Sequence, residues 1–322
     1  MRKIIVFLFV FALLIISYKE KEIVLSNNIE IKEQKSVNKS VNVKEQISNI
    51  RENNNKNSTQ KVSIVYKNNK KETLNLEDYV IGVVACEMPA SFNIEALKAM
   101  AVAARTFALY KIEHNKNYKL STTTKDQCYI TKDQMKKNWG NSFDKNYNKI
   151  VKSVSETSHQ RMTYNDKTII SFYFSISNGY TENCEDVFTQ KLSYLKSVDS
   201  HWDKKYSYKE KTVKISEKDF LNDLNIKDKT ITKIKINKDS KNRARYIYIN
   251  NNRFKGTTFR SLLHLRSTDI SISRKNGYIL ITTKGYGHGV GMSQYGANAM
   301  AKEGYKYDEI LKYYYKGIKL SV

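Results

Sequence analysis

Glu87 is the carboxylate whose neighbours in the sequence best suit acid–base chemistry. It follows an apolar stretch and lies two residues before Pro89, the only proline of the chain. Proline breaks a helix, so Glu87 is predicted at a helix end. Apolar surroundings raise the pKa of a carboxyl group, which can then donate a proton near neutral pH. The alternative is a solvated helix-end glutamate, because most glutamates are exposed.

A glycine-rich segment, GYGHGVG at residues 285–291, is the second candidate for chemistry. It is not the G-x-G-x-x-G fingerprint of dinucleotide-binding folds, and no βαβ unit follows it. Its glycines would allow close approach to a ligand or to the Glu87 segment. His288 could bond ligand hydroxyls or assist proton transfer, or it could only satisfy carbonyls of its own loop. Gln294 and Tyr295 are further candidates for substrate contact.

Arg105 lies inside an apolar stretch with helical spacing. A buried arginine must be paired, so we expect a carboxylate or a backbone carbonyl beside it. That partner would lie near the Glu87 site, or the pair would be purely structural, because structural ion pairs perturb charges as well.

The three cysteines, Cys86, Cys128 and Cys184, are too few for a disulfide scaffold and lack C-x-x-C spacing. Zinc needs three or four ligands, and no histidine adjoins Cys128, so we expect no metal site and no cofactor. Cys128 and Cys184 could pair in an exported domain, and the sequence leaves this open.

The elements that would position these residues mix helices and strands without regular alternation, which indicates an α+β fold. Helices are predicted at residues 76–86, 93–114, 143–158, 216–224, 292–303 and 308–315. Strands are predicted at residues 62–66, 72–76, 169–176, 213–215, 231–236, 246–249 and 278–283, with a hairpin turn at 165–166. We expect one globular region over residues 61–322, with room for two subdomains.

Residues 1–18 are predicted to be a membrane anchor. They begin with Met1-Arg2-Lys3 and continue as an almost wholly apolar run. This run is somewhat short for a bilayer, but flanking cations can snorkel, and no A-x-A-like cleavage site follows it. The basic start predicts a single-pass protein with its globular region outside the membrane. Residues 19–60 have no sustained period and predict a flexible linker.

The chain is strongly basic, with 56 Lys and Arg against 32 Asp and Glu and a formal net charge of +24. Such a charge attracts nucleic acid, anionic lipid or the anionic polymers of a cell wall. It is equally explained by a composition rich in Lys and Asn. No nucleic-acid motif accompanies it, so we do not expect a nucleic-acid partner.

Three separated segments carry a family resemblance. They are VVACEMPASFNIEALKAMAVAARTFALY (83–110), FYFSISNGYTENCEDVF (172–188) and GYGHGVGMSQYGANAMA (285–301). Together they closely resemble the stage II sporulation protein D family, which also includes amidase enhancers. The resemblance covers most of residues 62–322. It implies that Glu87 is a catalytic acid and that Ser177, Asn178, Glu182 and Asp186 form the far wall of a cleft.

Enzymes of this family are lytic transglycosylases, which cut the β-1,4 bond between N-acetylmuramic acid and N-acetylglucosamine and leave a 1,6-anhydro end. Ordinary glycosidases need two carboxylates, whereas this reaction can use one, because the 6-hydroxyl of the substrate replaces water. The resemblance further implies action on peptidoglycan glycan strands between the mother-cell and forespore membranes during engulfment. Its implied partners are a membrane-anchored amidase and a scaffold protein. The alternative is a non-catalytic amidase enhancer that binds glycan.

Overall fold

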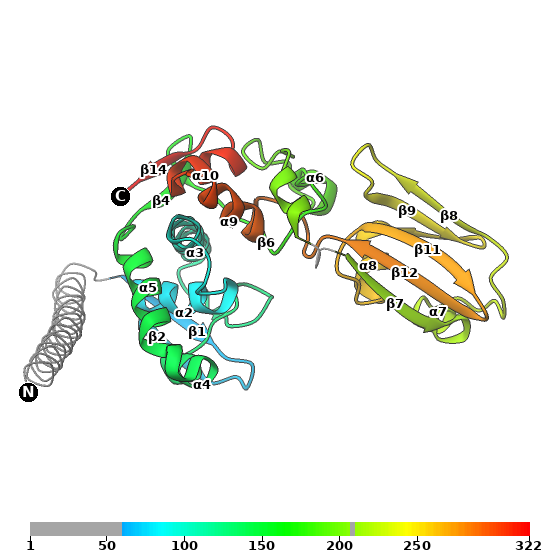
Figure 1. Ribbon diagram of the computed structural model, residues 1–322, viewed down its shortest axis with the longest axis horizontal. Helices are drawn as coiled ribbons and strands as arrows, with labels where there is room; N and C mark the ends of the chain where they lie inside the picture. Colours follow the sequence, from blue (N-terminus) through cyan, green and yellow to red (C-terminus); the bar gives the residue numbers. More distant parts are fainter. Residues whose placement is uncertain (1–59, 207–209) are drawn as a thin grey trace, which may run out of the picture. The chain divides into compact units, whose positions relative to one another are not determined.

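The computed structural model describes residues 60–206 and 210–322 (Figure 1). The predicted anchor, and the predicted linker except for its last residue, lie outside these ranges. Within the described ranges, no helix has the length and apolar character needed to cross a membrane. The described residues belong to one compact unit, Ser58–Val322, and their mixture of helices and strands confirms the α+β class.

Helix α3 (Ile94–His114) is the central element of the helical part. Helices α2 (Leu76–Glu87), α5 (Phe143–Ser155), α9 (Gln294–Lys302) and α10 (Tyr307–Tyr314) pack against it. In Figure 1, α3 lies between the pair α9 and α10 and the pair α2 and α5. Its many alanines let the neighbouring helices approach from several sides, so residues 96–109 of the helix, except Lys98, are buried. The side chain of Asn93 accepts a hydrogen bond from the backbone nitrogen of Glu95 at 2.9 Å, which is the predicted cap.

Small sheets flank these helices. Strands β1 (Lys61–Val65), β2 (Lys71–Asn75) and β3 (Leu120–Ser121) form one sheet in the order β2-β1-β3. Strands β4 (Arg161–Tyr164), β5 (Lys167–Thr168) and β14 (Lys319–Ser321) form another. The remaining short elements of this part are α4 (Lys132–Trp139), η1 (Gly140–Ser142), α6 (Cys184–Val187) and η2 (His201–Lys205).

The predicted strand at residues 169–176 is wrong as a continuous element. Only β6 (Tyr173–Phe174) forms a ladder there, and it runs parallel to β13 (Met292–Ser293). The backbone nitrogen of Ile170 instead donates to the hydroxyl of Tyr194 at 3.3 Å, and the backbone nitrogen of Ile176 donates to the carbonyl of Tyr286 at 3.1 Å. These bonds come from distant segments, so no local pattern could reveal them.

Residues 210–284, the β module, form two antiparallel sheets with a hydrophobic cluster of their own. One sheet has the order β11-β12-β7 and the other the order β10-β9-β8. Their bounds are β7 (Glu210–Ser216), β8 (Ile234–Lys238), β9 (Ala244–Ile249), β10 (Asn252–Lys255), β11 (Asp269–Lys275) and β12 (Tyr278–Lys284), with helices α7 (Glu217–Asp223) and α8 (Gly256–Leu262). Phe220, Ile247, Phe259 and Ile279 are fully buried in the cluster. Inward apolar and outward polar residues alternate, as in antiparallel sheets with one solvated face.

Candidate active site around Glu87

Glu87 ends α2 and receives three hydrogen bonds from neutral groups. Its Oε1 accepts from the backbone nitrogen of Cys128 at 2.8 Å and from the hydroxyl of Tyr173 at 3.3 Å. Its Oε2 accepts from Nε2 of Gln294 at 3.2 Å. Burial raises the pKa of Glu87 above its usual value, and the three hydrogen bonds, which favour the carboxylate, lower it only in part. No cation is among these partners, so the carboxyl group can hold a proton.

A chain of hydrogen bonds fixes the direction of the Tyr173 hydroxyl. Nε2 of Gln127 donates to this hydroxyl at 3.0 Å, and Oε1 of Gln127 accepts from the hydroxyl of Tyr79 at 3.1 Å. Because Tyr79 belongs to α2, the chain returns to the helix that carries Glu87. Burial raises the pKa of Tyr173 well above its usual value, so Tyr173 acts as a hydrogen-bond donor and not as a base. No local sequence pattern indicated that Tyr173, Gln127 and Tyr79 lie beside Glu87.

A disulfide joins Cys86 to Cys128, with Cα atoms 5.6 Å apart. It ties the end of α2 to the loop whose backbone nitrogen bonds Glu87. The pairing of Cys128 with Cys184 is therefore wrong: Cys184 is buried and free, and burial raises the pKa of its thiol to about 11. Within residues 60–206 and 210–322, no group of three or more His, Cys, Asp or Glu side chains could hold a metal ion.

Gln294 reaches Glu87 from the first position of α9. The side chain of Ser293 caps this helix by accepting from the backbone nitrogen of Gly296 at 3.1 Å. The same hydroxyl donates to Oδ1 of Asp203 at 2.9 Å, and Oδ2 of Asp203 accepts from the backbone nitrogen of Ser177 at 3.0 Å. Asp203 thus joins Ser177, which follows β6, to Ser293, which precedes α9. It holds together the two elements that carry Tyr173 and Gln294. Burial raises the pKa of Asp203 to about 6.

Ser177 is fully buried in this Asp203 network, where its hydroxyl accepts from the backbone nitrogen of Gly179 at 2.9 Å. Its full burial and its place in this network favour a supporting role over contact with a substrate. Tyr295 packs its ring against the rings of Phe92 and Tyr206, with centroids 4.9 Å apart in each pair. Gln294, the other candidate named with Tyr295, bonds Glu87.

The glycine loop approaches the segment that carries Tyr173. A Cβ on Gly287, whose φ is +119°, would lie 2.6 Å from Cβ of Phe174. A Cβ on Gly291 would overlap the carbonyl oxygen of Phe172. The loop therefore needs glycine in order to pack against residues 172–174, which carry Tyr173, and this differs from the expected approach to the Glu87 segment itself.

His288 supports this packing. Its Nδ1 accepts from the backbone nitrogen of Val290 at 3.1 Å, and its ring lies near the rings of Phe172, Phe174 and Phe188. Burial lowers the pKa of His288 to about 4, so the imidazole is neutral near pH 7. The structure therefore favours a structural role for His288, with the amide of Val290 and not a loop carbonyl as the partner of Nδ1.

We expect His288 to make the fold sensitive to acid. The unfolded imidazole binds a proton near pH 6.5, and the folded one only near pH 4. Stability should therefore fall as the pH drops through this window, by about 1–3 kcal/mol from this group. His288→Asn keeps an acceptor but does not titrate, so its stability should depend less on pH. Urea unfolding of both proteins at pH 7 and pH 4.5 measures the difference, and identical changes would contradict this assignment.

Arg105 forms a buried ion pair away from Glu87. Its Nε donates to Oε1 of Glu77 at 2.7 Å, its Nη2 donates to Oε2 at 2.5 Å, and its Nη1 donates to the carbonyl of Gln160 at 3.1 Å. The side chain is 0% exposed. Glu77 lies in the first turn of α2, about 15 Å along the helix from Glu87. The expected pairing is present, and the printed contacts of Arg105 go to Glu77 and to backbone carbonyls and not to Glu87.

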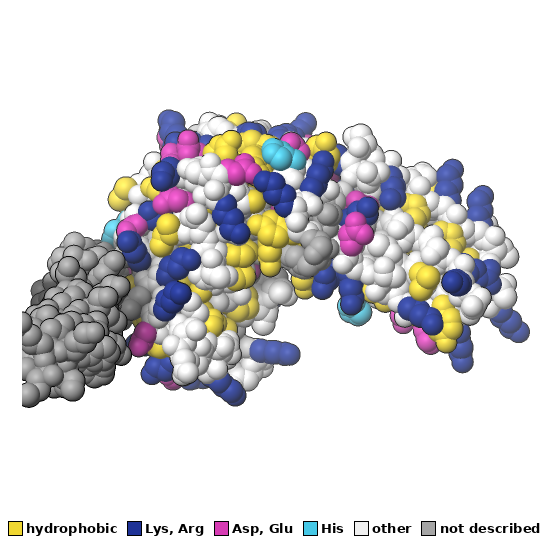
Figure 2. All heavy atoms as spheres, in the orientation of Figure 1, with side chains coloured by type: hydrophobic (Ala, Val, Ile, Leu, Met, Phe, Trp, Pro, Cys, Tyr) yellow, Lys and Arg dark blue, Asp and Glu magenta, His cyan; other side chains and the backbone are white. Residues whose placement is uncertain are grey.

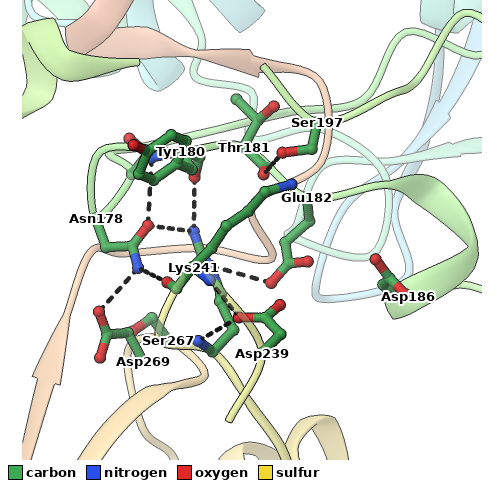
Figure 3. A network of polar contacts seen from close by, with 12 residues as sticks. Asn178, Tyr180, Thr181, Glu182, Asp186, Ser197, Asp239, Lys241, Ser267 and Asp269 are labelled. Carbon is green, nitrogen blue, oxygen red and sulfur yellow. Dashed lines mark hydrogen bonds and ion pairs between the residues drawn. The ribbon is translucent and has the colours of Figure 1, made fainter. Parts of the chain in front are cut away.

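The segment after Ser177 attaches to the β module through a polar network (Figure 3). Nδ2 of Asn178 donates to Oδ2 of Asp269 at 2.8 Å. Glu182 is 1% exposed and lies between two arginines. Nη2 of Arg245 donates a hydrogen bond to Oε2 of Glu182 at 3.0 Å. Nε of Arg243 lies 3.0 Å from Oε1 of Glu182, but the two atoms are not aligned for a hydrogen bond. Asp186 also accepts from Arg245 at 3.0 Å. These residues join two parts of the chain, and Glu182 and Asp186 also line a surface pocket there.

The chain is similar to several known proteins. A family model described as Stage II sporulation protein matches residues 65–164. Stage II sporulation protein D of Bacillus subtilis (strain 168) is 43% identical over 258 residues, which cover 78% of this chain and 75% of the relative. The protein of that name from Bacillus amyloliquefaciens is 43% identical over 263 residues, covering 79% and 76%. The Amidase enhancer of Bacillus subtilis is 29% identical over 299 residues, covering 74% of this chain and 40% of the relative.

Proposed function

Because the chain belongs to the stage II sporulation protein D family, we propose that it is a lytic transglycosylase acting on peptidoglycan during sporulation. It would cut the β-1,4 bond between N-acetylmuramic acid and N-acetylglucosamine and leave 1,6-anhydro ends. The observation that carries the proposal is the state of Glu87: a carboxyl group with a raised pKa, held by neutral donors.

Glu87 acts first as an acid. Two donors occupy Oε1 and one occupies Oε2, so the proton for the leaving oxygen belongs on Oε2. Its transfer leaves a carboxylate, which the Cys128 nitrogen, Tyr173 and Gln294 then stabilise. The carboxylate next takes the proton of the 6-hydroxyl as that oxygen attacks the anomeric carbon. Because the attacking group belongs to the same sugar, its high effective concentration replaces a positioned water and a second carboxylate.

Tyr173 tunes this acid. Its hydrogen bond favours the carboxylate, so Tyr173→Phe should raise the pKa of Glu87 further. The first step needs protonated Glu87, and we therefore expect the alkaline limb of the pH–rate profile to move to higher pH. The rate at the optimum should fall about 10- to 100-fold, since one hydrogen bond to a charged group is worth about 1.5–3 kcal/mol. Tyr278→Phe, a substitution at an exposed tyrosine, is the matched control. An unmoved alkaline limb would show that Tyr173 does not act on Glu87.

The predicted anchor and linker complete the proposal. They would hold the globular region outside the membrane, between the mother cell and the forespore, together with a membrane-anchored amidase and a scaffold protein. Protease added to intact protoplasts should then remove the globular region. Complete protection from the protease, or release of a soluble mature form, would contradict the proposed topology.

The Amidase enhancer relative supports a second candidate function, that of a non-catalytic glycan-binding protein which stimulates an amidase. Incubation of the full-length chain with purified glycan strands, free of amidase, separates the two. Shortened strands support the transglycosylase. Strands of unchanged length, together with faster peptide release when an amidase is added, would support the enhancer.

A further inference from the structure

The outer face of the sheet β10-β9-β8 alternates tyrosines with cations. In the strand register, Tyr248 lies between Lys235 and Arg253, and Tyr246 lies between Asn237 and Lys255. The neighbouring residues Ile236, Ile247 and Phe254 point to the opposite face and pack in the hydrophobic cluster. We call the residues Lys235, Tyr246, Tyr248, Arg253 and Lys255 the basic aromatic face.

The cations of this face are exposed and lack acidic partners. Lys235, Arg253 and Lys255 are all exposed, and none forms an ion pair with any residue in 60–206 or 210–322. Arg253 instead stacks on Tyr246, with its guanidinium carbon 5.2 Å from the ring centroid. Two other arginines of the β module differ in this respect, because Arg243 and Arg245 both form ion pairs with Glu182. The three cations therefore remain available for an external anion.

The rest of the β module is also rich in positive charge. In residues 210–284, Lys and Arg outnumber Asp and Glu by more than two to one, a larger excess than in the full chain, where 56 stand against 32. In Figure 2, Lys and Arg side chains project around this part, with few acidic ones among them. A surface of one sign raises the local concentration of an oppositely charged ligand.

The spacing of the cations restricts the ligand. Arg253 and Lys255 lie two residues apart on one strand, about 7 Å, and Lys235 lies two strands from Arg253, about 10 Å. A matching ligand must carry anions at short intervals. Phosphodiesters that join small polyols or sugars carry an anion every few ångströms and can match both separations, whereas a glycan strand with one carboxylate per disaccharide can match only the longer one. Tyr246 and Tyr248 offer ring faces to the C–H groups of such a backbone.

We propose that the basic aromatic face binds an anionic phosphodiester polymer of the cell wall and so retains the protein at its site of action. This proposal takes the location of the protein at the cell wall from the proposed function. It does not require Glu87 to be catalytic. It assigns the β module a binding role separate from the cleavage site.

The test measures binding of the full-length chain, in detergent, to purified poly(glycerol phosphate) and to sedimented cell walls. One variant removes the cations of the face, namely Lys235→Ala, Arg253→Ala and Lys255→Ala. A matched variant removes three exposed cations elsewhere in the β module, namely Lys218→Ala, Lys227→Ala and Lys229→Ala. Walls are used intact and after acid removal of their phosphodiester polymers.

We expect the first variant to bind poly(glycerol phosphate) at least about tenfold more weakly at 0.1 M salt. The slope of log affinity against log salt should become shallower by about 2, since each lost phosphate contact on a flexible polyanion contributes about 0.7. The matched variant should lose much less affinity for poly(glycerol phosphate). Stripped walls should bind wild type and both variants equally.

Three results would overturn the proposal. Equal losses in both variants would show that only net charge matters. A loss by the first variant that persists on stripped walls would assign the face to glycan. Tighter binding of wild type to single-stranded DNA than to the polymer would assign it to nucleic acid. Cleavage of glycan strands is measured on the same samples. If the proposed function is wrong, wild type does not cleave the strands. If only the binding proposal is wrong, wild type still cleaves them.

Discussion

Glu87→Gln is expected to lower the rate of glycan cleavage at least about 100-fold, because general acid–base catalysis contributes about 10²–10⁴-fold. Glutamine keeps the size of the side chain and an oxygen that can accept from Cys128 and Tyr173. It cannot donate an acidic proton to the leaving oxygen. The rate of strand shortening measures the effect, with Glu210→Gln, a substitution at an exposed glutamate of β7, as the matched control.

The fold should survive this substitution. The pKa of Glu87 is raised in the folded chain, so ionisation of Glu87 opposes folding as the pH rises above its unfolded value, near 4.3. Glu87→Gln removes that cost and should unfold at the same or a higher urea concentration at pH 7. Retained cleavage in a folded variant would remove Glu87 from the catalytic role.

Arg105→Leu is expected to produce the largest loss of stability, about 3–5 kcal/mol. The substitution leaves the carboxylate of Glu77 without its bidentate partner in a buried position, and this is the costly way to break a buried ion pair. It also removes the donor to the carbonyl of Gln160. Urea unfolding followed by circular dichroism measures the change.

Arg161→Leu provides the comparison, because Arg161 pairs with Glu113 at the surface, with side chains 35% and 41% exposed. A surface pair contributes about 0–1 kcal/mol, so this variant should unfold close to wild type. If Arg105→Leu lost cleavage activity while keeping wild-type stability, Arg105 would serve the site directly and the structural assignment would be wrong.

Local sequence signals predicted the parts of the fold that depend on neighbouring residues. The Asn93 cap, the end of α2 before Pro89 and the inward alternation of β12 all follow from short-range rules. The apolar neighbours of Glu87 likewise predicted its raised pKa. For the cap, the helix end and the strand, the physical cause lies within a few residues of the effect, whereas the burial that raises the pKa of Glu87 also needs distant segments.

The partners of Glu87 were predictable only in part, because they come from three distant segments. Gln294 was named from its place after the glycine loop. Tyr173 and the backbone of Cys128 were missed, since parallel pairing of β6 with β13 and the disulfide from Cys86 bring them to the site. Arg105 shows the same limit: its burial was predicted, but the position of its partner depended on how α2 packs against α3.

The chemical nature of the new strand ends tests the central claim most directly. Glycan strands stripped of peptides are digested with the full-length chain and with Glu87→Gln, and the products are weighed by mass spectrometry. Attack by the 6-hydroxyl predicts 1,6-anhydro-muramic ends, lighter than a hydrolysis product by one water, with wild type and almost none with Glu87→Gln. Reducing ends formed by wild type would contradict the intramolecular mechanism and indicate a hydrolase.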